Sequence, residues 1–188
     1  MRIAEINEEV ISKLQKSLIS TEMRSLESCE WAVLEEIDEN IVGAAGMGGV
    51  FHVSGIQIKN EFRGKGIGKK IQAKLIEESY KKGYSFITVF NDPRNTNSVN
   101  LHDGLGYEKI FRIHYSKGMV NDVKGISFNK KGKVIINFLK IFNTKIGTII
   151  LAISLKILKA IFPKLIIYNE KNFPSPDIKW IIKNFEKI

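Results

Sequence analysis

The clearest periodic pattern along the chain lies between residues 67 and 80. Apolar side chains recur there with the spacing of one helix face, and lysines and glutamates fill the positions between them; the apolar positions are Ile67, Ile71, Leu75, Ile76 and Tyr80. This spacing predicts an amphipathic helix. The Lys-Lys-Gly sequence at residues 81–83 is typical of a helix end, because glycine readily adopts the left-handed conformation that terminates helices.

Short β-branched and apolar segments flank this predicted helix. VSGIQIK (residues 53–59) precedes it and SFITVF (85–90) follows it, and both have the composition of strands. Residues 31–46 have the pattern of a β-hairpin with its turn at 38–40, and residues 8–28 have that of one or two helices. We therefore expect an α+β (mixed α/β) fold with a sheet of at least five strands.

The C-terminal third combines long apolar runs with isolated lysines. Its longest run without a charge, residues 146–155, is shorter than the about 20 residues that cross a bilayer, so we expect no membrane span. A broad apolar surface must still be covered. We favour packing on the sheet or on a second subunit, as in a homodimer, over peripheral contact with an anionic membrane surface. A last helix is expected at residues 177–186, with its buried side formed by Ile178, Ile181, Ile182 and Phe185.

Charge is distributed unevenly along the 188 residues. Residues 1–116 hold 15 Lys and Arg against 16 Asp and Glu, a net charge of −1, whereas residues 117–188 hold 14 against 4, a net charge of +10. We therefore predict a division into a core at residues 1–118 and a basic, mainly helical extension at 119–188. Nucleic acid is not an expected partner, because the basic part contains no arginine.

The cysteine content and the N-terminal sequence bear on the compartment. Cys29 is the single cysteine, so no internal disulfide can form, and no Cys/His spacing predicts a metal site. The N-terminal sequence MRIAEINEEV has acidic residues where a signal peptide would carry its apolar core. We expect a cytoplasmic protein that uses no metal.

The segment EFRGKGIGKKIQ (residues 61–72) places three glycines and four cations within eight residues at the start of the predicted helix. It is not a P-loop, because Arg63 and Lys70 stand where that motif needs glycine and Ser or Thr, and its glycine spacing differs from the dinucleotide-binding fingerprint. Free backbone N–H groups at a helix start attract anions, and glycines allow close approach. The segment therefore predicts a diphosphate site that needs no magnesium.

The sequence R-x-x-G-x-G between a strand and an amphipathic helix resembles the coenzyme A signature of the GNAT N-acetyltransferase superfamily. A second segment, NTNSVNLHDGLGY (residues 95–107), resembles that family's second signature, N-x-x-[AS]-x-x-L-[YH]-x-x-x-G-[FY]. Two signatures in the expected order make the resemblance specific over residues 41–115. It implies a three-layer α/β/α fold around a mixed, mostly antiparallel sheet. The sheet would close with a strand at 108–115 and a second strand at 133–138 or 165–168.

The resemblance also implies a set of site residues. Acetyl-CoA would lie along the strand and on the glycine segment, bound by Ile56, Gln57, Ile58, Arg63, Gly64, Lys65, Gly66, Ile67, Gly68 and Lys69. A strand N–H would stabilise the oxyanion. Asn95 would contact the pantetheine or a water, and Ser98 would lie near it, although both residues also suit simple capping. His102 stands where relatives commonly carry a tyrosine, and it would protonate the leaving thiolate.

No residue stands out as the general base that would deprotonate the amine. Residues 40–60 contain no Asp or Glu, so the candidates are His52, His114, Asp92, Glu22 and Glu27, or a chain of water molecules. Residues 5–39 hold ten acids against three bases, which suits a cationic acceptor. A polyamine, an amino sugar, a lysine or a protein N-terminus would each fit.

The resemblance implies transfer of the acetyl group of acetyl-CoA to a primary amine by direct attack in a ternary complex. Two alternatives stay open. The first is a catalytically weak acyl-CoA-binding or regulatory module with a basic apolar docking tail, because the strand carboxylate and the tyrosine are missing. The second is an enzyme that uses a longer acyl donor, which the apolar extension could accommodate.

Overall fold

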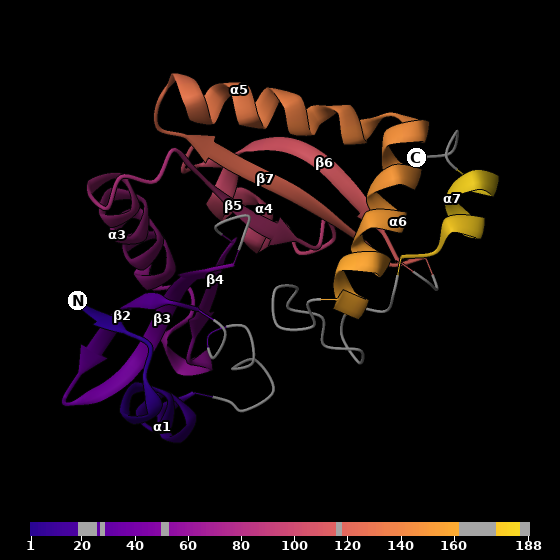
Figure 1. The fold of residues 1–188 in the computed structure, drawn as a ribbon. Coiled ribbons are helices and arrows are strands. Elements are labelled where there is room, and N and C mark those ends of the chain that lie inside the picture. Colours follow the sequence, from indigo (N-terminus) through magenta and orange to yellow (C-terminus); the bar gives the residue numbers. More distant parts are fainter. Residues whose placement is uncertain (19–25, 27–28, 50–52, 116–117, 162–175, 185–188) are drawn as a thin grey trace. The chain divides into compact units, whose positions relative to one another are not determined.

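The computed structural model describes residues 1–18, 26, 29–49, 53–115, 118–161 and 176–184 (Figure 1). The chain forms two compact units, residues 1–87 and 88–188. The division that the charge distribution predicted, into a core at residues 1–118 and an extension at 119–188, stays a prediction.

Among its described residues, the first unit contains four complete strands, two helices and a short 3-10 turn. Its strands are β1 (Arg2–Glu5), β2 (Trp31–Ile37), β3 (Asn40–Gly48) and β4 (Val53–Ile58), and its helical elements are α1 (Glu8–Ser17), η1 (Asn60–Phe62) and α3 (Ile67–Lys81). The strands lie in the order β1-β2-β3-β4, and each neighbouring pair is antiparallel. The predicted hairpin, the strand before the glycine segment and the helix after it are all confirmed.

Helices α1 and α3 cover opposite faces of β3, because successive side chains of a strand point to opposite sides. Ala44 packs in a buried cluster with Val10 and Leu14 of α1. At the neighbouring Gly43, an added Cβ would lie 2.7 Å from Ile71 of α3, so this face touches the other helix. The strands thus form the middle layer of three.

The β2–β3 turn lies within residues 38–40, where the sequence pattern predicted it. Asp38 and Glu39 have φ angles of 49° and 64°. Two consecutive residues with positive φ give the turn a twist that matches that of the flanking strands. The strand β1 was not predicted, because only Ala4 of its four residues is buried and it shows no extended alternation.

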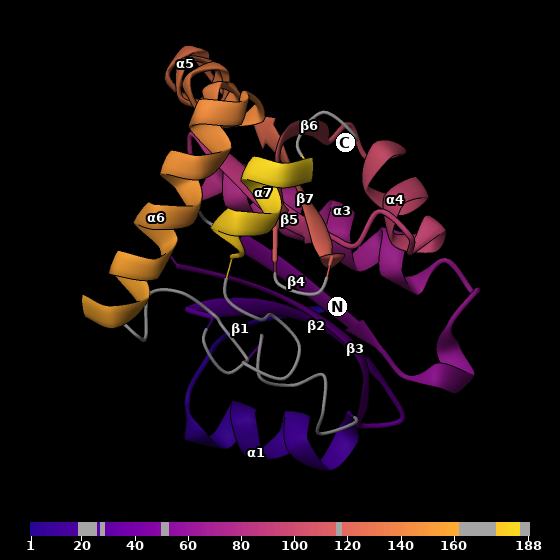
Figure 2. The ribbon, with the colours of Figure 1, turned by 90° about the vertical axis from the view of Figure 1, so that its right-hand side faces the viewer.

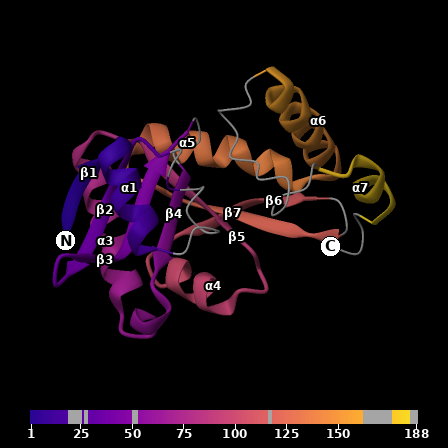
Figure 3. The ribbon, with the colours of Figure 1, turned by 90° about the horizontal axis from the view of Figure 1, so that it is seen from below.

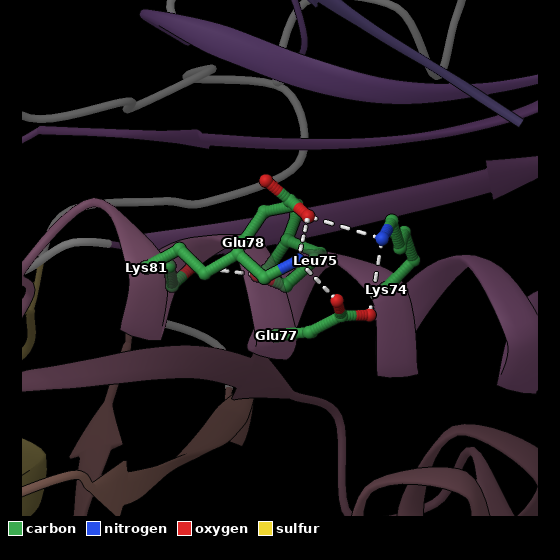
Figure 4. A network of polar contacts seen from close by, with 6 residues as sticks. Lys74, Leu75, Glu77, Glu78 and Lys81 are labelled. Atoms are coloured by element: carbon green, nitrogen blue, oxygen red, sulfur yellow. Dashed lines mark hydrogen bonds and ion pairs between the residues drawn. The ribbon is translucent and has the colours of Figure 1, made fainter.

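Helix α3 carries a ladder of ion pairs on its exposed side (Figure 4). Lys74 contacts Glu77 at 3.1 Å and Glu78 at 3.0 Å, and Lys81 contacts both glutamates from the next turn. Such pairs at spacings of three and four support a helix modestly and are screened by salt. The buried side, which includes Leu75, holds the helix in place.

The second unit begins within β5 (Phe86–Asn91), which crosses the boundary between the units. It continues with α4 (Thr96–Asp103), β6 (Glu108–His114), β7 (Val120–Ser127), α5 (Lys130–Leu139), η3 (Lys140–Asn143), α6 (Lys145–Ile161) and α7 (Ile178–Asn184). Strands β6 and β7 are antiparallel. Figure 3 shows α5 running along this strand pair.

The strand that closes the sheet was predicted in the wrong place. The partner of β6 is β7 (Val120–Ser127), whereas residues 133–138, one of the two predicted alternatives, lie in helix α5. The error has a physical reason, since Asn129 caps a helix here by accepting the N–H of Gly132 at 2.9 Å. The other alternative, residues 165–168, lies outside the described residues.

The three helices α5, α6 and α7 confirm the expected helical character of the C-terminal segment. No single described helix is long and apolar enough to span a membrane, although the α5–η3 segment and α6 together meet the length and composition criteria across a bend of 102°. Figure 2 shows α6 beside α7. In α7, Ile181 is fully buried as predicted, but Ile182 is 55% exposed, which corrects that assignment; Phe185 lies outside the described residues.

Helix α7 is attached to the end of β6 through a ring stack. His114 and Trp180 are stacked with ring centroids 5.4 Å apart, and the Asp177 N–H donates to the His114 carbonyl oxygen at 3.3 Å. The imidazole is buried, and its Nδ1 has no hydrogen-bond partner among the described atoms. Burial, reinforced by the Arg112 cation, lowers the pKa of His114 to about 4.

The pKa of His114 predicts an acid-sensitive fold. The unfolded chain takes up a proton near the ordinary pKa of 6.5, whereas the folded chain resists it until about pH 4. The free energy of unfolding should therefore decrease by on the order of 2 kcal/mol as the pH falls from about 6.5 to about 4. Urea unfolding across this range would measure it. His114→Phe keeps a ring against Trp180 and should flatten this part of the curve; an unchanged slope would contradict the assignment.

The corner between η3 and α6 predicts a second stability effect. A Cβ on Gly147 would lie 2.1 Å from the carbonyl oxygen of Ile141 and 2.9 Å from the Phe142 Cα, so main-chain atoms would have to move. Gly147→Ala should lower the free energy of unfolding by about 1–3 kcal/mol although alanine favours helices. Ser154→Ala in the same helix is the matched control and should cost much less. Equal stability of the two variants in urea titrations would show that the corner relaxes freely.

Candidate functional site

The glycine segment forms an open helix start in the first unit. Gly64 and Gly66 have φ angles of 77° and 76°, a region that glycine adopts without strain. A Cβ added to either residue would meet no atom within 4 Å. The glycines are therefore required by the backbone conformation and leave open space beside it.

The first turn of α3 has neither a side-chain cap nor an acidic residue. Gly66 occupies the N-cap position without a side chain that could accept a hydrogen bond, whereas Asn7 caps α1 and Asn129 caps α5. The first N–H groups of a helix need an acceptor, and the helix dipole favours a negative one. The start of α3 is thus suited to an anion.

Cations surround this helix start. Arg63 is exposed, and its Nε donates to the Ile58 carbonyl oxygen at 3.0 Å, which ties the segment to the end of β4. The Lys65 ammonium lies 4.9 Å from the centroid of the Phe62 ring. Lys69 is exposed on the first turn of the helix. The predicted residues 63–69 therefore lie together as one positively charged, glycine-rich turn.

The predicted strand residues lie at the end of β4. Ile56, Gln57 and Ile58 pair with β3 and are half-buried. Their partners in β3 are the small residues Ala45, Ala44 and Gly43. The chain then passes through η1 directly into the glycine segment, so one short path connects the strand backbone to the helix start.

In the second unit, α4 and its N-cap bring together Asn95, Ser98 and His102, the three site residues predicted from the second signature. The Asn95 side chain caps the helix by accepting the Ser98 N–H at 3.1 Å. The Ser98 hydroxyl donates to the Asn91 side-chain oxygen at 3.2 Å. Capping thus accounts for the position of Asn95, and the buried Asn91 is a partner that the sequence did not reveal.

His102 is buried one turn after Ser98. Its Nδ1 lies 2.8 Å from the Ser98 carbonyl oxygen. Because a carbonyl oxygen only accepts, Nδ1 must carry the hydrogen, and in the neutral ring Nε2 then holds a lone pair. Burial lowers the pKa of His102, and the hydrogen bond to Ser98 only partly opposes this. The Tyr107 ring packs edge-on at 5.1 Å and fixes the imidazole plane.

The residue after His102, Asp103, is half-exposed and forms an ion pair with a buried lysine. Lys124 of β7 is 6% exposed and pairs with the Asp103 carboxylate at the end of α4. The Lys124 charge lowers the pKa of His102, and Asp103 raises it. Sequence patterns did not indicate this pair, because the two residues are 21 positions apart and become neighbours only when β7 pairs with β6.

None of the described candidates for the general base has a pKa suited to the role. The Asp92 carboxylate is bound by the Arg94 guanidinium at 2.7 Å, which lowers its pKa. His114 has a lowered pKa and is stacked on Trp180. A base works best when its pKa lies near the operating pH. The other candidates, Glu22, Glu27 and His52, lie outside the described residues.

Solved acetyltransferases share the fold of the chain. An acetyltransferase of the GNAT family from Streptococcus pneumoniae superposes with a TM-score of 0.56 at 13% identity, over 68% of this chain and 99% of that one. A ribosomal-protein-alanine N-acetyltransferase from Brucella melitensis gives 0.52 at 16%, over 68% and 100%. A protein of Salmonella typhimurium described as an acetyltransferase, with its cofactor acetyl-CoA, gives 0.50 at 17%, over 53% of this chain and 65% of that one.

The sequence comparisons give the family directly. Among curated proteins, none matches the sequence. A family model described as the acetyltransferase (GNAT) domain matches residues 3–121, which is more than half of the chain. The expected mixed α/β fold with a mostly antiparallel sheet is confirmed. The chain therefore belongs to the GNAT acetyltransferase family.

Proposed function

We propose that the protein is an N-acetyltransferase that moves the acetyl group of acetyl-CoA to a primary amine by direct attack in a ternary complex. The uncapped start of α3, behind two open glycines and without any acid in its first turn, carries this proposal. It supplies what a diphosphate needs, namely free N–H donors, close access and positive charge. The family match supports the same assignment.

The co-substrate would be held by two neighbouring segments. The backbone N–H groups of residues 66–69 and the cations Arg63, Lys65 and Lys69 would bind the diphosphate of coenzyme A. Ile56, Gln57 and Ile58 would lie along the pantetheine, and a backbone N–H of this strand would stabilise the oxyanion during acyl transfer. In this arrangement the chain needs no metal ion to hold the phosphates.

Proton transfer is the second chemical task of the site. The attacking nitrogen forms a bond to the acyl carbon and must lose a proton, and the carbon–sulfur bond breaks to leave a thiolate that must gain one. Neutral His102 has its lone pair on Nε2, because Nδ1 donates to the Ser98 carbonyl oxygen. We assign Nε2 to take the proton from the attacking amine nitrogen and to deliver it to the thiolate sulfur. The second step is the acid role that was predicted for His102 from the sequence.

The acceptor is a primary amine. The acidic composition of residues 5–39 supports a cationic acceptor, and one solved neighbour is named as an enzyme that acts on ribosomal-protein alanine. Polyamines, aminoglycosides, amino acids and short peptides with a free N-terminus are therefore the classes to compare. Acetyl-CoA should be compared with longer acyl-CoA donors in the same assay.

The decisive experiment measures thiol release from acetyl-CoA with each amine class, beside a titration of coenzyme A binding. We expect binding together with turnover for one class. Binding without turnover for any amine would favour the alternative of a docking or regulatory module. A failure to bind coenzyme A would show that the glycine segment is only a surface turn.

Two charge reversals make the binding titration specific. Lys69→Glu adds an acid to the first turn of α3 and should weaken coenzyme A binding by roughly tenfold, because it repels the diphosphate and opposes the helix dipole. Lys16→Glu in α1 changes the net charge equally and should leave the affinity nearly unchanged. Equal affinities of the two variants would place the coenzyme elsewhere.

His102→Gln should reduce turnover by about tenfold to a thousandfold and leave coenzyme A affinity intact. Because neutral His102 takes up the proton, wild-type turnover should fall as the pH drops through its pKa, which burial places below the ordinary value of 6.5. The variant should lose this acidic limb. An unchanged rate and pH profile would remove His102 from the mechanism.

Substitution of the neighbouring Asp103 separates a catalytic role of His102 from a structural one. The Asp103 carboxylate raises the pKa of His102, so Asp103→Asn should shift the acidic limb to lower pH while keeping the imidazole in place. Turnover at pH 8 should stay close to that of the wild type. A shift to higher pH would contradict the assigned proton acceptor.

A further inference from the structure

Helix α6 is apolar on two opposite sides. One side is buried in the second unit and consists of Thr148, Leu151, Ala152 and Leu155. The other side is exposed and consists of Ile146, Ile150, Ile153 and Ile157, whose exposed fractions are 72%, 51%, 43% and 52%. These four isoleucines recur at steps of four, three and four, so they form a single line along the helix. We call them the α6 stripe.

Exposed apolar residues continue from the α6 stripe into the preceding segment. Val134 and Phe138 of α5 are each 68% exposed, and Ile141 of η3 is 54% exposed. The same helix α5 buries Ile136 and Leu139 on its other side, so its packing requirement is already met. The α6 stripe by itself places four exposed isoleucines side by side on one helix, and an unpartnered apolar row of this kind indicates a binding face.

The charged residues within the segment that carries this face are all of one sign, although Glu108 of β6 pairs with Lys140 at 3.5 Å. Between residues 125 and 169 the sequence contains no Asp, Glu or Arg, but it contains eight lysines: 130, 131, 133, 140, 145, 156, 159 and 164. On a helical projection, Lys145 and Lys156 fall on one flank of α6, between the buried side and the α6 stripe. Lysine stems pack along apolar surface while their ammonium groups reach outward.

The exposed isoleucines and the lysines beside them distinguish between two candidate partners for the α6 stripe. A second copy of the chain would bring the same lysine-rich segment against itself, and like charges would repel. An anionic lipid surface offers both an apolar layer for the isoleucines and phosphate groups for the lysines. Helix α6 has 17 residues, about 25 Å of helix, and suits a position in the plane of the interface. No single described helix meets the criteria for a span.

We propose that the α6 stripe and its flanking lysines bind the surface of an anionic phospholipid bilayer. This reverses the preference drawn from the sequence, in which packing on the sheet or a second subunit accounted for the apolar residues. The exposure of the α6 stripe on a helix whose other side is already buried is what changes the conclusion. The proposal does not depend on the acyl transfer described above.

Sedimentation of the full chain with vesicles tests the proposal. One set of vesicles contains phosphatidylcholine alone, and the other contains about 30% phosphatidylglycerol. We expect binding to the anionic vesicles that weakens as salt is raised from about 50 mM to about 500 mM, and little binding to the neutral ones. The double variant Ile150→Ser with Ile153→Ser should lose at least about tenfold in partitioning, because its buried apolar area is reduced.

A matched control distinguishes binding through the α6 stripe from nonspecific hydrophobic adsorption to the vesicles. Tyr80 of α3 is 63% exposed, so Tyr80→Ser removes a comparable apolar side chain from another helix and should leave vesicle binding unchanged. The substituted positions are exposed, and thermal unfolding should confirm that all variants stay folded. Lys145→Gln with Lys156→Gln should weaken binding to the anionic vesicles only.

Several results would overturn the proposal. Absence of binding to anionic vesicles would do so, as would equal binding to neutral vesicles or equal binding by the Ile150→Ser and Ile153→Ser variant. A concentration-dependent dimer in size-exclusion chromatography that this variant converts to a monomer would assign the α6 stripe to a second copy instead.

Discussion

The unmet hydrogen-bonding capacity at the start of α3 is the constraint on which the site depends. A helix normally satisfies its first N–H groups with a side-chain acceptor, as α1, α4 and α5 do with asparagines. At α3 a glycine occupies that position, and the surrounding side chains are cationic. The chain therefore forgoes local capping at this helix and keeps its donors available for a ligand that brings negative charge.

Burial and one hydrogen bond define the chemistry of α4. The Ser98 carbonyl oxygen fixes the tautomer of His102, and the edge of Tyr107 fixes the ring plane. Because the imidazole is kept neutral, it can receive a proton and pass it on without a large change in its surroundings. In the proposed mechanism this one residue takes the proton from the amine and returns it to the thiolate, so that no separate base is needed.

The sequence predicted those parts of the fold that depend on local pattern. Helix α3, the hairpin around Asp38 and the strand β6 follow from spacing and turn chemistry. The partner of β6 could not be predicted in this way, since VNDVKGIS (β7) contains two charged residues. In the fold Asp122 pairs with Arg112 and Lys109, and Lys124 pairs with Asp103. The open start of α3 was predicted from the sequence. The Lys124–Asp103 pair and the hydrogen bond from Ser98 to Asn91 could not be predicted, because they depend on three-dimensional contacts.

Lys124 also links the family domain to the rest of the chain. The family model ends at residue 121, but β7 continues to Ser127 and brings this lysine to the carboxylate that follows His102. The pKa of the His102 imidazole is thus set partly by a residue beyond the boundary of the family domain. A version of this protein trimmed at that boundary, for expression or for grafting onto another chain, would lose most of the strand that pairs with β6 and, with it, the electrostatic tuning of its histidine.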